Sequence, residues 1–415
     1  DAWWAEQVGL PAGTKRCTDT LDVWIDSGSS HVAVMDRHPE LSCPADLYLE
    51  ATDQHRGWFQ SSLMLSVAVR DKAPYKTVLT HGFVVDKDGG KISKSDAKKK
   101  GKPTDAAHFY NKYGADIVRL WVSSVDWQNE VPFGEDLFKQ TAEPYRRFRN
   151  ILRILLANLY DFDSEKDSVG PKDHTLLERW ILERLNVVIA ECRDAYEAFE
   201  FRKVFNTLNQ FCASELSAFY VDITKDRLYC DAPDSPRRRA TQTVMHQVFE
   251  SLAKLLAPIL AFTADEAWSF AGHEQSIHLE CFPEVDPSND GTEATEQVAE
   301  LTRLRDLAQV AIDAAIKADE FKKRERAAVT FQLPEEDPAR DILSGDREVA
   351  LEFLMISDFS VTLGEEASAS VAETSETECP RCRRSLPLAD GEELCERCVD
   401  AMRVIEAARP SFSEA

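Results

Sequence analysis

The sequence contains no hydrophobic run long enough to cross a membrane. Among its 415 residues the longest apolar stretches, such as 151–159, are interrupted by polar residues. They fall short of the roughly 20 residues that a membrane-spanning helix needs. Residues 1–6 show neither the basic start nor the apolar run of a secretory signal peptide. We therefore expect a cytoplasmic protein that does not contact a membrane.

Positive charge is also scarce. The 49 Lys and Arg residues are outnumbered by 73 Asp and Glu residues, which leaves a formal net charge of −24. A surface this acidic does not wrap nucleic acid as a whole, so any contact with RNA must be local. The length fits two to four domains. The start at Asp1, without a methionine, leads us to expect a chain cut from a longer one.

The ten cysteines fall into two groups. Six are scattered singly, as reduced core residues of a cytosolic protein would be: Cys17, Cys43, Cys192, Cys212, Cys230 and Cys281. The other four form two pairs, Cys379-x2-Cys382 and Cys395-x2-Cys398. Two such pairs suit four thiolates around one tetrahedral zinc ion. The alternative, two disulfides, is disfavoured in a reducing cytosol. We predict one structural zinc ion at these four residues.

The first third of the chain has the pattern of an α/β fold. From residue 21 to about residue 125, short apolar runs alternate with helical patterns, which predicts a mostly parallel sheet. Candidate strands are 21–25, 46–49 and 77–85. Residues 57–69 are predicted to form a helix after the second strand. Together these segments predict a strand, turn and helix unit.

Most of the remaining chain has a helical pattern. After Phe138, apolar residues recur at spacings of three and four, which predicts a helical bundle. A small mixed α/β region follows. Residues 364–378 contain five glutamates, no basic residue and few large apolar side chains. Such a composition cannot bury enough surface to fold, so we predict a flexible linker there.

Two groups of arginines offer local positive charge for RNA. The first lies beside the apolar stripe of the first bundle helix and comprises Arg146, Arg147, Arg149 and Arg153. The second lies on the first cysteine pair and comprises Arg381, Arg383 and Arg384. Arginines at such positions can contact phosphates. For the first group, a solvated helix face explains the pattern equally well.

The most specific motif is the loop sequence KISKS at residues 91–95, preceded by DGG at 88–90, which favours a tight turn. Lys91 and Lys94 are three residues apart, so both can reach one anionic ligand. Placed against a triphosphate, they would stabilise the charge that develops on the leaving pyrophosphate. Without further evidence, a loop of this kind is more often simply solvated.

Two polar clusters change that assessment. The strings EATDQHRGWF at 50–59 and THGFV at 80–84 follow neighbouring candidate strands, at the position where open α/β sheets bind ligands. In this order, together with the KISKS loop, they resemble the second half of the catalytic domain of isoleucyl-tRNA synthetases, a family of class I aminoacyl-tRNA synthetases. The strings DVWIDSG at 22–28 and YGAD at 113–116 match as well, and the resemblance covers nearly the whole chain.

The resemblance implies a site for isoleucyl-adenylate. Glu50 would bind the adenylate, where its carboxylate can pair with the ammonium group of the amino acid. Asp53 and Gln54 would lie beside the nucleotide and its ribose. Trp58 and Trp24 would form the wall of the aliphatic side-chain pocket, because an indole presents a large rigid apolar face. Packing in the core is the alternative explanation for both tryptophans.

The resemblance also implies a site for ATP. His81, Gly82 and Val84 would surround the adenine. Lys94 would bind ATP and act in catalysis together with Lys91, both of them at the leaving group. Mg²⁺ would accompany the nucleotide.

A domain order follows from the resemblance. A Rossmann-like α/β catalytic half-domain is expected first, then an α-helical bundle, a small mixed α/β region and a zinc-binding module. The expected ranges are 1–90 for the second half of the catalytic domain, 91–137 for the loop and its connecting region, 138–290 for the anticodon-binding domain, 291–363 for the carboxy-terminal junction region, 364–378 for the acidic linker and 379–402 for the zinc-binding module.

The activity implied is that of an isoleucine–tRNA ligase, which activates isoleucine with ATP and transfers it to tRNA(Ile), as a monomer. The histidine-rich phosphate-binding signature and the editing domain of the family are absent from the sequence, so we expect these residues alone to be inactive. A valyl or leucyl enzyme is an alternative, although those enzymes generally lack the zinc module. A non-catalytic tRNA-binding remnant of a synthetase is another.

Overall fold

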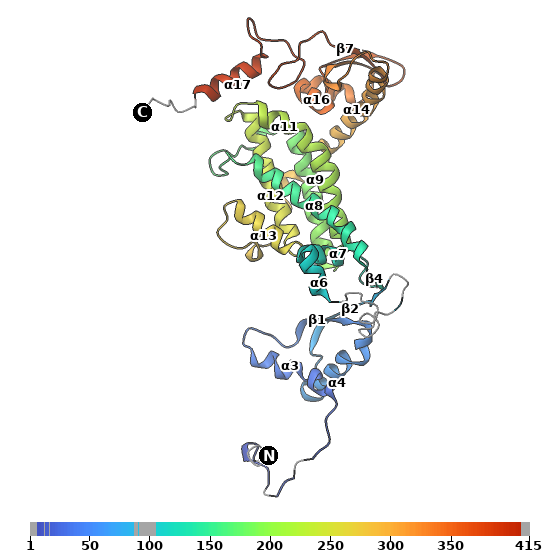
Figure 1. Ribbon diagram of the computed structural model, residues 1–415, viewed down its shortest axis with the longest axis vertical. Coiled ribbons are helices and arrows are strands. Elements are labelled where there is room, and N and C mark those ends of the chain that lie inside the picture. Colours follow the sequence, from blue (N-terminus) through green and yellow to red (C-terminus); the bar gives the residue numbers. More distant parts are fainter. Residues whose placement is uncertain (1–5, 12, 16, 87–89, 91–104, 408–415) are drawn as a thin grey trace, which may run out of the picture. The chain divides into compact units, whose positions relative to one another are not determined.

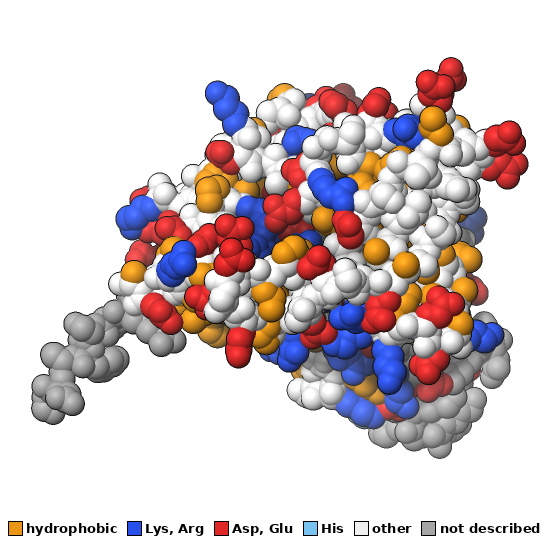
Figure 2. Space-filling model, turned by 90° about the horizontal axis from the view of Figure 1, so that it is seen from above, with side chains coloured by type: hydrophobic (Ala, Val, Ile, Leu, Met, Phe, Trp, Pro, Cys, Tyr) orange, Lys and Arg blue, Asp and Glu red, His pale blue; other side chains and the backbone are white. Residues whose placement is uncertain are grey.

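The computed structural model describes residues 6–11, 13–15, 17–86, 90 and 105–407, which divide into two compact units (Figure 1). The first unit comprises 1–104 and 125–134, and the second comprises 105–124 and 135–415. Acidic and basic side chains are interspersed over the face drawn in Figure 2. Within the described ranges, no helix has the length and apolarity that a bilayer span requires.

The first unit is built around a βαβ arrangement. Strands β1 (Ala45–Ala51) and β2 (Tyr75–His81) pair in parallel, connected by the 3₁₀ turn η2 (Thr52–Arg56) and helix α4 (Trp58–Arg70). The strand predicted at 46–49 and the helix predicted at 57–69 are confirmed. The strand predicted at 77–85 divides into β2 and the short β3 (Val84–Val85), which pairs in parallel with β4 (Val131–Pro132).

The strand predicted at 21–25 is wrong, because the structure has helix α2 (Val23–Gly28) there, followed by α3 (Ser30–Ala33) and the 3₁₀ turn η1 (Met35–Arg37). Asp22 caps α2: its Oδ1 accepts a hydrogen bond from the backbone N–H of Trp24 at 2.9 Å. This cap favours a helix in an apolar string that otherwise has the composition of a strand. A Cβ added at Gly28 would lie 2.8 Å from Ser61 Oγ, so α2 lies close against α4.

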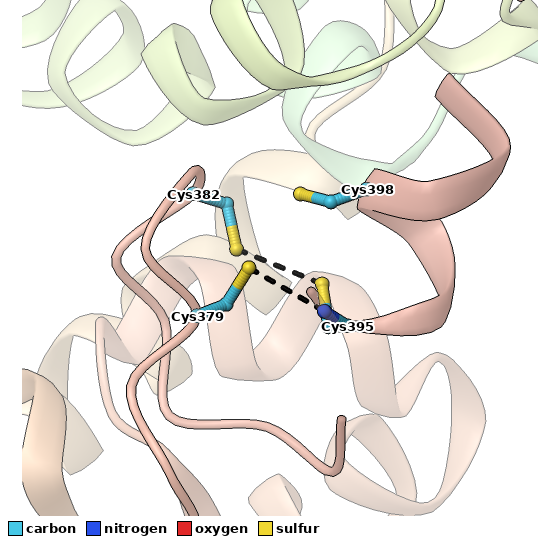
Figure 3. A group of neighbouring side chains, drawn as sticks. All are labelled: Cys379, Cys382, Cys395 and Cys398. Carbon is cyan, nitrogen blue, oxygen red and sulfur yellow. Dashed lines mark hydrogen bonds between the residues drawn. The ribbon is translucent and has the colours of Figure 1, made fainter. Parts of the chain in front are cut away.

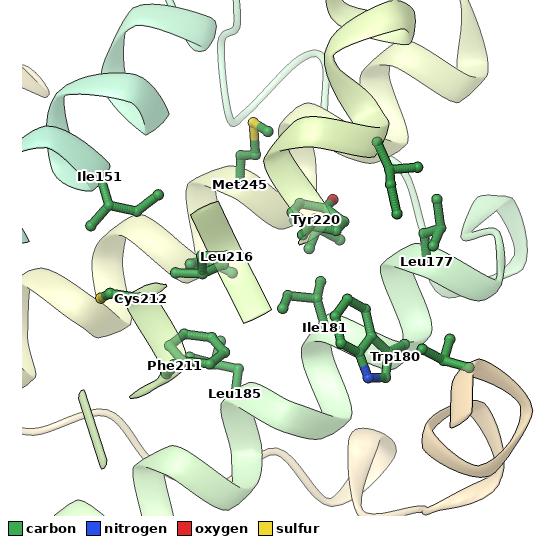
Figure 4. Close-up of a cluster of buried hydrophobic side chains, with 14 of the residues drawn as sticks. Ile151, Leu177, Trp180, Ile181, Leu185, Phe211, Cys212, Leu216, Tyr220 and Met245 are labelled. Carbon is green, nitrogen blue, oxygen red and sulfur yellow. The ribbon is translucent and has the colours of Figure 1, made fainter. Parts of the chain in front are cut away.

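The second unit contains the predicted helical bundle, in which α12 packs against α8, α9 and α11 (Figure 1). Its helices and turns are α6 (Ala106–Tyr113), α7 (Ala115–Ser124), α8 (Glu135–Asn158), η3 (Pro171–Asp173), α9 (Leu176–Glu197), α10 (Phe201–Gln210), the π-helix η4 (Phe211–Tyr220), α11 (Val221–Cys230), α12 (Pro236–Leu256), α13 (Ala261–Phe270), η5 (Ile277–Leu279) and η6 (Pro287–Asn289). Ile181, Phe211, Leu216 and Met245 are fully buried between the helices (Figure 4). The spacing of apolar residues by three and four therefore marks the core correctly.

The small mixed region follows helix α14 (Glu293–Lys317). It contains η7 (Arg324–Arg326), helices α15 (Ala339–Gly345) and α16 (Arg347–Leu354), and a three-stranded sheet in the order β6-β5-β7. The central strand β5 (Ala327–Leu333) pairs in parallel with β6 (Asp358–Leu363) and antiparallel with β7 (Ser368–Glu373).

The flexible linker predicted at 364–378 is wrong, since it contains strand β7. The register runs from Ser368 opposite Gln332 to Glu373 opposite Ala327, so the backbone hydrogen bonds of β7 are made to β5. An edge strand needs only one apolar face, and the small alternating residues Ala369 and Val371 supply it against the core. The composition of residues 364–378 does not indicate that backbone pairing with β5 stabilises a strand there.

A buried ion network joins the bundle to the mixed region. Arg227 on α11 is fully buried, and its Nη1 lies 3.0 Å from both carboxylate oxygens of Glu178 on α9. Its Nε and Nη2 donate to Glu352 on α16 at 2.9 and 2.7 Å. Arg237 on α12 also pairs with Glu352, at 2.8 Å. These contacts fix the position of α16 on the bundle.

Candidate functional sites

The first polar cluster lies at the carboxyl ends of the parallel strands β1 and β2. The register places Glu50 opposite Thr80 and Ala51 opposite His81, so the two strings singled out in the sequence end at the same edge of the sheet. The Glu50 carboxylate is exposed and accepts a hydrogen bond from the backbone N–H of Ala51 at 2.8 Å. Among the residues that the structure describes, no cation pairs with it. It is therefore available to a positively charged ligand.

Gln54 lies in η2 and organises the start of α4. Its Oε1 accepts a hydrogen bond from the backbone N–H of Trp58 at 3.1 Å, so it satisfies one of the free N–H groups at the helix start. Its Nε2 donates to Asp53 Oδ2 at 3.4 Å. The exposed Asp53 carboxylate is thus oriented by a residue that is itself fixed by the helix.

The two predicted pocket tryptophans have clear packing contacts. Trp58 stacks on Tyr48, with ring centroids 4.2 Å apart and planes inclined by 5°, and its indole N–H donates to the Ser27 carbonyl at 3.0 Å. A Cβ added at Gly57 would lie 2.9 Å from the Trp24 ring, which remains 41% exposed. Both indoles therefore hold α2 against the start of α4, and Trp24 keeps an open face.

The second cluster requires glycine at position 82, for a structural reason that the sequence does not reveal. A Cβ at Gly82 would lie 1.9 Å from the Asn129 carbonyl oxygen, and the Gly82 N–H donates to the Trp127 carbonyl at 2.9 Å. His81 Nδ1 lies 2.8 Å from the Gly82 carbonyl oxygen. Val84 is 47% exposed in β3. Close approach of the segment 127–129 thus requires glycine at this position.

Lys91 and Lys94 lie outside the described residues, as does the rest of the KISKS loop. The structure does describe the residues where this loop begins. The Asp86 N–H donates to the Gly90 carbonyl at 2.9 Å, and the Gly90 N–H donates to Asp86 Oδ1 at 2.9 Å. These two hydrogen bonds join Asp86 to Gly90, whereas residues 88 and 89 of the DGG string lie outside the described residues.

The structure brings Cys379, Cys382, Cys395 and Cys398 together in one cluster, with all four Sγ atoms within 4.8 Å of one another. Cys379 and Cys382 come from a loop, Cys395 directly precedes α17 (Glu396–Ala407) and Cys398 lies on it. Their sulfur atoms converge (Figure 3). Cys382 Sγ and Cys395 Sγ are 3.8 Å apart. Tetrahedral zinc with bonds of about 2.3 Å requires sulfur atoms about 3.8 Å apart. The cluster therefore fits a tetrahedral metal ion.

The protein surroundings act in opposite directions on the thiols of the cluster: burial raises the pKa of Cys382 and of Cys395 above the usual value, whereas the pKa of Cys379 is lowered. Burial alone would raise the pKa of the Cys379 thiol, but the backbone N–H groups of Cys382 and Cys395 lower it to about 6. Cys398 Sγ accepts a hydrogen bond from Arg381 at 3.5 Å. No disulfide joins these four cysteines in the structure.

The cysteine module is docked on α11, a contact that sequence reasoning missed. Arg397 on α17 donates two hydrogen bonds to Asp226 on α11, at 2.6 and 2.9 Å. Burial raises the pKa of Asp226, but the hydrogen bonds and charge of Arg397 outweigh it and leave this pKa below its usual value. Arg381 donates to the Cys230 carbonyl, and Cys230 packs against the four clustered cysteines.

The three arginines of the first cysteine pair therefore have protein partners. Arg381 contacts Cys230, Arg383 pairs with Glu378 at 3.2 Å and Arg384 lies 3.8 Å from Asp226. Their predicted role as a positive face for RNA is weakened, because neighbouring acidic and carbonyl groups offset their charge.

Two family models match the chain and agree with this geometry. Residues 4–133 match "tRNA synthetases class I (I, L, M and V)", and residues 178–330 match "Anticodon-binding domain of tRNA ligase". A LeuRS of Agrobacterium radiobacter K84, solved with tRNA and LeuAMS, shares the fold over 80% of this chain and 39% of its own, with a TM-score of 0.53 and 17% identity. In these two ranges the chain is similar to class I tRNA synthetases and to their anticodon-binding domain.

Within that class the sequence is similar to isoleucine–tRNA ligases. The ligase of Methylacidiphilum infernorum is 41% identical over 93% of this chain and 42% of its own length. The ligase of Symbiobacterium thermophilum is 40% identical over 96% of this chain and 46% of its own length. The chain thus spans less than half the length of these curated relatives.

Proposed function

We propose that the chain forms the second half of the adenylation site and the tRNA-binding part of an isoleucine–tRNA ligase. The observation that carries this proposal is the similarity to isoleucine–tRNA ligases at about 40% identity along nearly all of the chain. The exposed Glu50 carboxylate at the end of β1, which pairs with no cation among the described residues, supports it. The match of residues 178–330 to an anticodon-binding domain supports a tRNA as the partner.

In the proposed reaction, the isoleucine carboxylate attacks the α-phosphate of ATP, accompanied by Mg²⁺, and pyrophosphate leaves. The acyl group then passes from the adenylate to a ribose hydroxyl of the terminal adenosine of the tRNA, and AMP leaves. Glu50 pairs with the ammonium group and orients the amino acid, which is catalysis by positioning. Lys91 and Lys94 stabilise the charge on the leaving pyrophosphate.

The remaining predicted residues complete the proposed site. Asp53, oriented by Gln54, faces the ribose. His81, Gly82 and Val84 surround the adenine, and Gly82 admits the Asn129 carbonyl beside that position. The open face of Trp24 borders the side-chain pocket together with Trp58, whose stacking on Tyr48 makes it a rigid wall.

The cysteine cluster would hold one structural zinc ion through Cys379, Cys382, Cys395 and Cys398. In the described part of the module only a few apolar side chains, such as Leu386, Leu388 and Leu394, pack against the cluster. That is too little for an independent core, so metal binding supplies folding energy to the module. Its contacts with α11 then place it beside the bundle, in a position to serve tRNA binding.

The test replaces Glu50 by Gln in the full-length natural protein. This change keeps the shape and removes the charge that pairs with the ammonium group, so the KM for isoleucine should rise while the KM for ATP changes little. Isoleucine-dependent ATP–pyrophosphate exchange measures both. The matched control is Asp46→Asn, an exposed acid on the same strand that pairs with Lys76 at 2.6 Å.

An unaltered KM for isoleucine in E50Q would contradict the role of Glu50. Exchange driven by valine or leucine in preference to isoleucine would favour the alternative enzymes. Binding of tRNA by the wild-type protein without any exchange would identify a non-catalytic remnant instead.

A further inference from the structure

A pocket in the second unit lies where the bundle meets the mixed region, and the proposed adenylation site does not use it. Its volume is about 510 Å³, which is within the range of small-molecule sites. The turn η3 and the start of α9 line one side, and α14, α15 and α16 line the rest. A ligand in this pocket would therefore contact the bundle and the mixed region at once.

His174 brings an unused hydrogen-bonding atom to this pocket. The residue is only 7% exposed, and its Nε2 has no partner among the residues that the structure describes. Arg179 Nη1 donates to the His174 backbone carbonyl at 3.0 Å, which fixes the residue at the pocket wall. Burial lowers the pKa of His174, so its imidazole is neutral near neutral pH. A buried polar atom without a partner costs free energy, which a ligand atom within hydrogen-bond distance would offset.

Five charged side chains line the same pocket. The bases are Lys172 and Arg179, and the acids are Asp173, Asp341 and Asp346. All five are exposed, and in the described part of the chain none of them forms an ion pair. Unpaired charges of both signs therefore surround one hollow.

The floor of the pocket is apolar. Leu176 on α9, Leu301 on α14 and Val349 on α16 line it and belong to the buried core. An aliphatic group that rests on these side chains would be removed from water, which is favourable in proportion to the apolar area buried. The pocket thus combines an apolar floor with two kinds of charge and one buried polar atom.

We propose that this pocket binds a free α-amino acid with an aliphatic side chain, whose carboxylate pairs with Arg179 and whose ammonium group pairs with Asp341 and Asp346. The side chain of the amino acid lies on the apolar floor, and His174 Nε2 gains a partner at the charged end. A guanidinium group suits a carboxylate because it can donate two parallel hydrogen bonds. The inference goes beyond the proposed function and does not depend on the adenylation site.

Other classes of ligand fit the pocket less well. A phosphate or an RNA segment would face three carboxylates, and a polyamine would face Lys172 and Arg179, and like charges in contact are unfavourable. A wholly apolar molecule would leave His174 Nε2 buried without a partner. A zwitterion with an aliphatic side chain matches both signs of charge and the floor.

The experiment adds L-isoleucine, without ATP, to the full-length natural protein and follows hydrogen exchange by mass spectrometry. Binding at the pocket should slow exchange in residues 172–179 and 341–350, and the amino-acid concentration that gives half of this effect measures the affinity. Exchange in residues 45–59 reports the adenylation site separately. The slower exchange at the pocket should persist in E50Q, because Glu50 is not among the residues that line it.

Two substitutions test the pocket itself. His174→Phe keeps an aromatic ring but removes Nε2, and Arg179→Gln removes the proposed partner of the carboxylate. Each should weaken binding at least about tenfold. Because Nε2 has no partner within the ranges described, H174F should unfold at the wild-type temperature. The matched control is Arg202→Gln on α10, which removes an exposed arginine that also forms no ion pair with a described residue. It should bind as the wild type does.

Ligands that lack one part of isoleucine test each contact in turn. The α-oxo acid of isoleucine lacks the ammonium group, the amine formed by its decarboxylation lacks the carboxylate, and glycine lacks the aliphatic side chain. Each should bind at least about tenfold more weakly than isoleucine, because one of the three contacts is lost.

The outcomes distinguish this inference from the proposed function. Slower exchange in residues 45–59 alone would overturn only the inference. Slower exchange at the pocket, in a protein without isoleucine-dependent ATP–pyrophosphate exchange, would overturn only the proposed function. Inorganic phosphate or the α-oxo acid binding at the pocket as tightly as isoleucine would also overturn the inference, because the site would then select an anion and not a zwitterion.

Discussion

The ion network around Arg227 leads to a strong prediction about stability. Replacing Arg227 by Met removes one buried cation and leaves the Glu178 carboxylate, which is fully buried, without its charged partner. Glu352 is less affected because it keeps its contact with Arg237 at 2.8 Å. The substitution therefore tests chiefly the pairing of α11 with α9.

The expected loss follows from the burial of the pair. Breaking a buried ion pair by removing one partner costs about 3–5 kcal/mol, because an uncompensated charge remains. Because Glu352 still pairs with Arg237, only Glu178 is left without a cation. We expect R227M to lower the free energy of unfolding of the second unit by ~4 kcal/mol. An exposed pair on the same helix contributes only about 0–1 kcal/mol.

The pH dependence gives an independent check. Burial raises the pKa of Glu178, but the charge of Arg227 and hydrogen bonds from Thr175 and Thr241 outweigh it, so the native pKa lies below its usual value. Native stability from this group is present above the unfolded pKa and is lost as the pH falls through the native pKa. In R227M, burial without the cation raises the pKa of Glu178, so this carboxylate takes up a proton more readily and no longer leaves a buried charge. The difference in the free energy of unfolding between R227M and the wild type therefore narrows as the pH is lowered.

Urea unfolding followed by far-ultraviolet circular dichroism measures the difference. Lys225→Met on the same helix is the control, because Lys225 is half-exposed and pairs with Asp222 at 2.7 Å. Adding Glu178→Gln to R227M should recover part of the loss, since no buried charge then remains at that position. The reasoning is refuted if R227M is no less stable than K225M near neutral pH, or if its deficit stays constant as the pH falls.

Three further predictions concern other parts of the chain. Gly82→Ala should lower the stability of the first unit by about 1–3 kcal/mol, because the Asn129 carbonyl occupies the space of the added Cβ. The control Gly345→Ala, where no atom lies within 4 Å of the added Cβ, should cause no such loss. Thermal unfolding compares the two variants. Cys395→Ser should abolish stoichiometric zinc in metal analysis and make residues 379–402 sensitive to protease; retained zinc would contradict the four-ligand site. Asp226→Asn should leave zinc bound but increase hydrogen exchange in the same module, whereas unaltered exchange would show that the Arg397 pair does not hold it.

The parts of the fold that sequence reasoning predicted well are those set by local patterns. The βαβ arrangement of β1, α4 and β2 follows from short apolar runs and a helical period, and the bundle follows from apolar residues three and four apart. The cysteine cluster follows from spacing, because two pairs on short segments need little else to converge. The resemblance to synthetases could be found from short motifs and from their order along the chain, without any knowledge of the structure.

The features that were missed depend on partners distant in sequence or on backbone contacts. Helix α2 has the composition of a strand, and its formation depends on the Asp22 cap and on contact with α4. The pair of Arg397 and Asp226 joins residues 171 positions apart, which no local pattern signals. Gly82 could be singled out by its motif, but the need for glycine there comes from Asn129.

The pairing of β7 with β5 has a practical consequence for any attempt to remove the cysteine module. A protein truncated near residue 363, where the acidic composition begins, would lose β7 and leave one edge of β5 unpaired. A free edge of alternating apolar residues is a template for edge-to-edge association between molecules. A truncated protein that ends after Thr374, whose N–H donates to the Arg326 carbonyl at 2.8 Å, would keep that edge covered. Any functional defect of the shorter protein would therefore reflect self-association as well as the missing module.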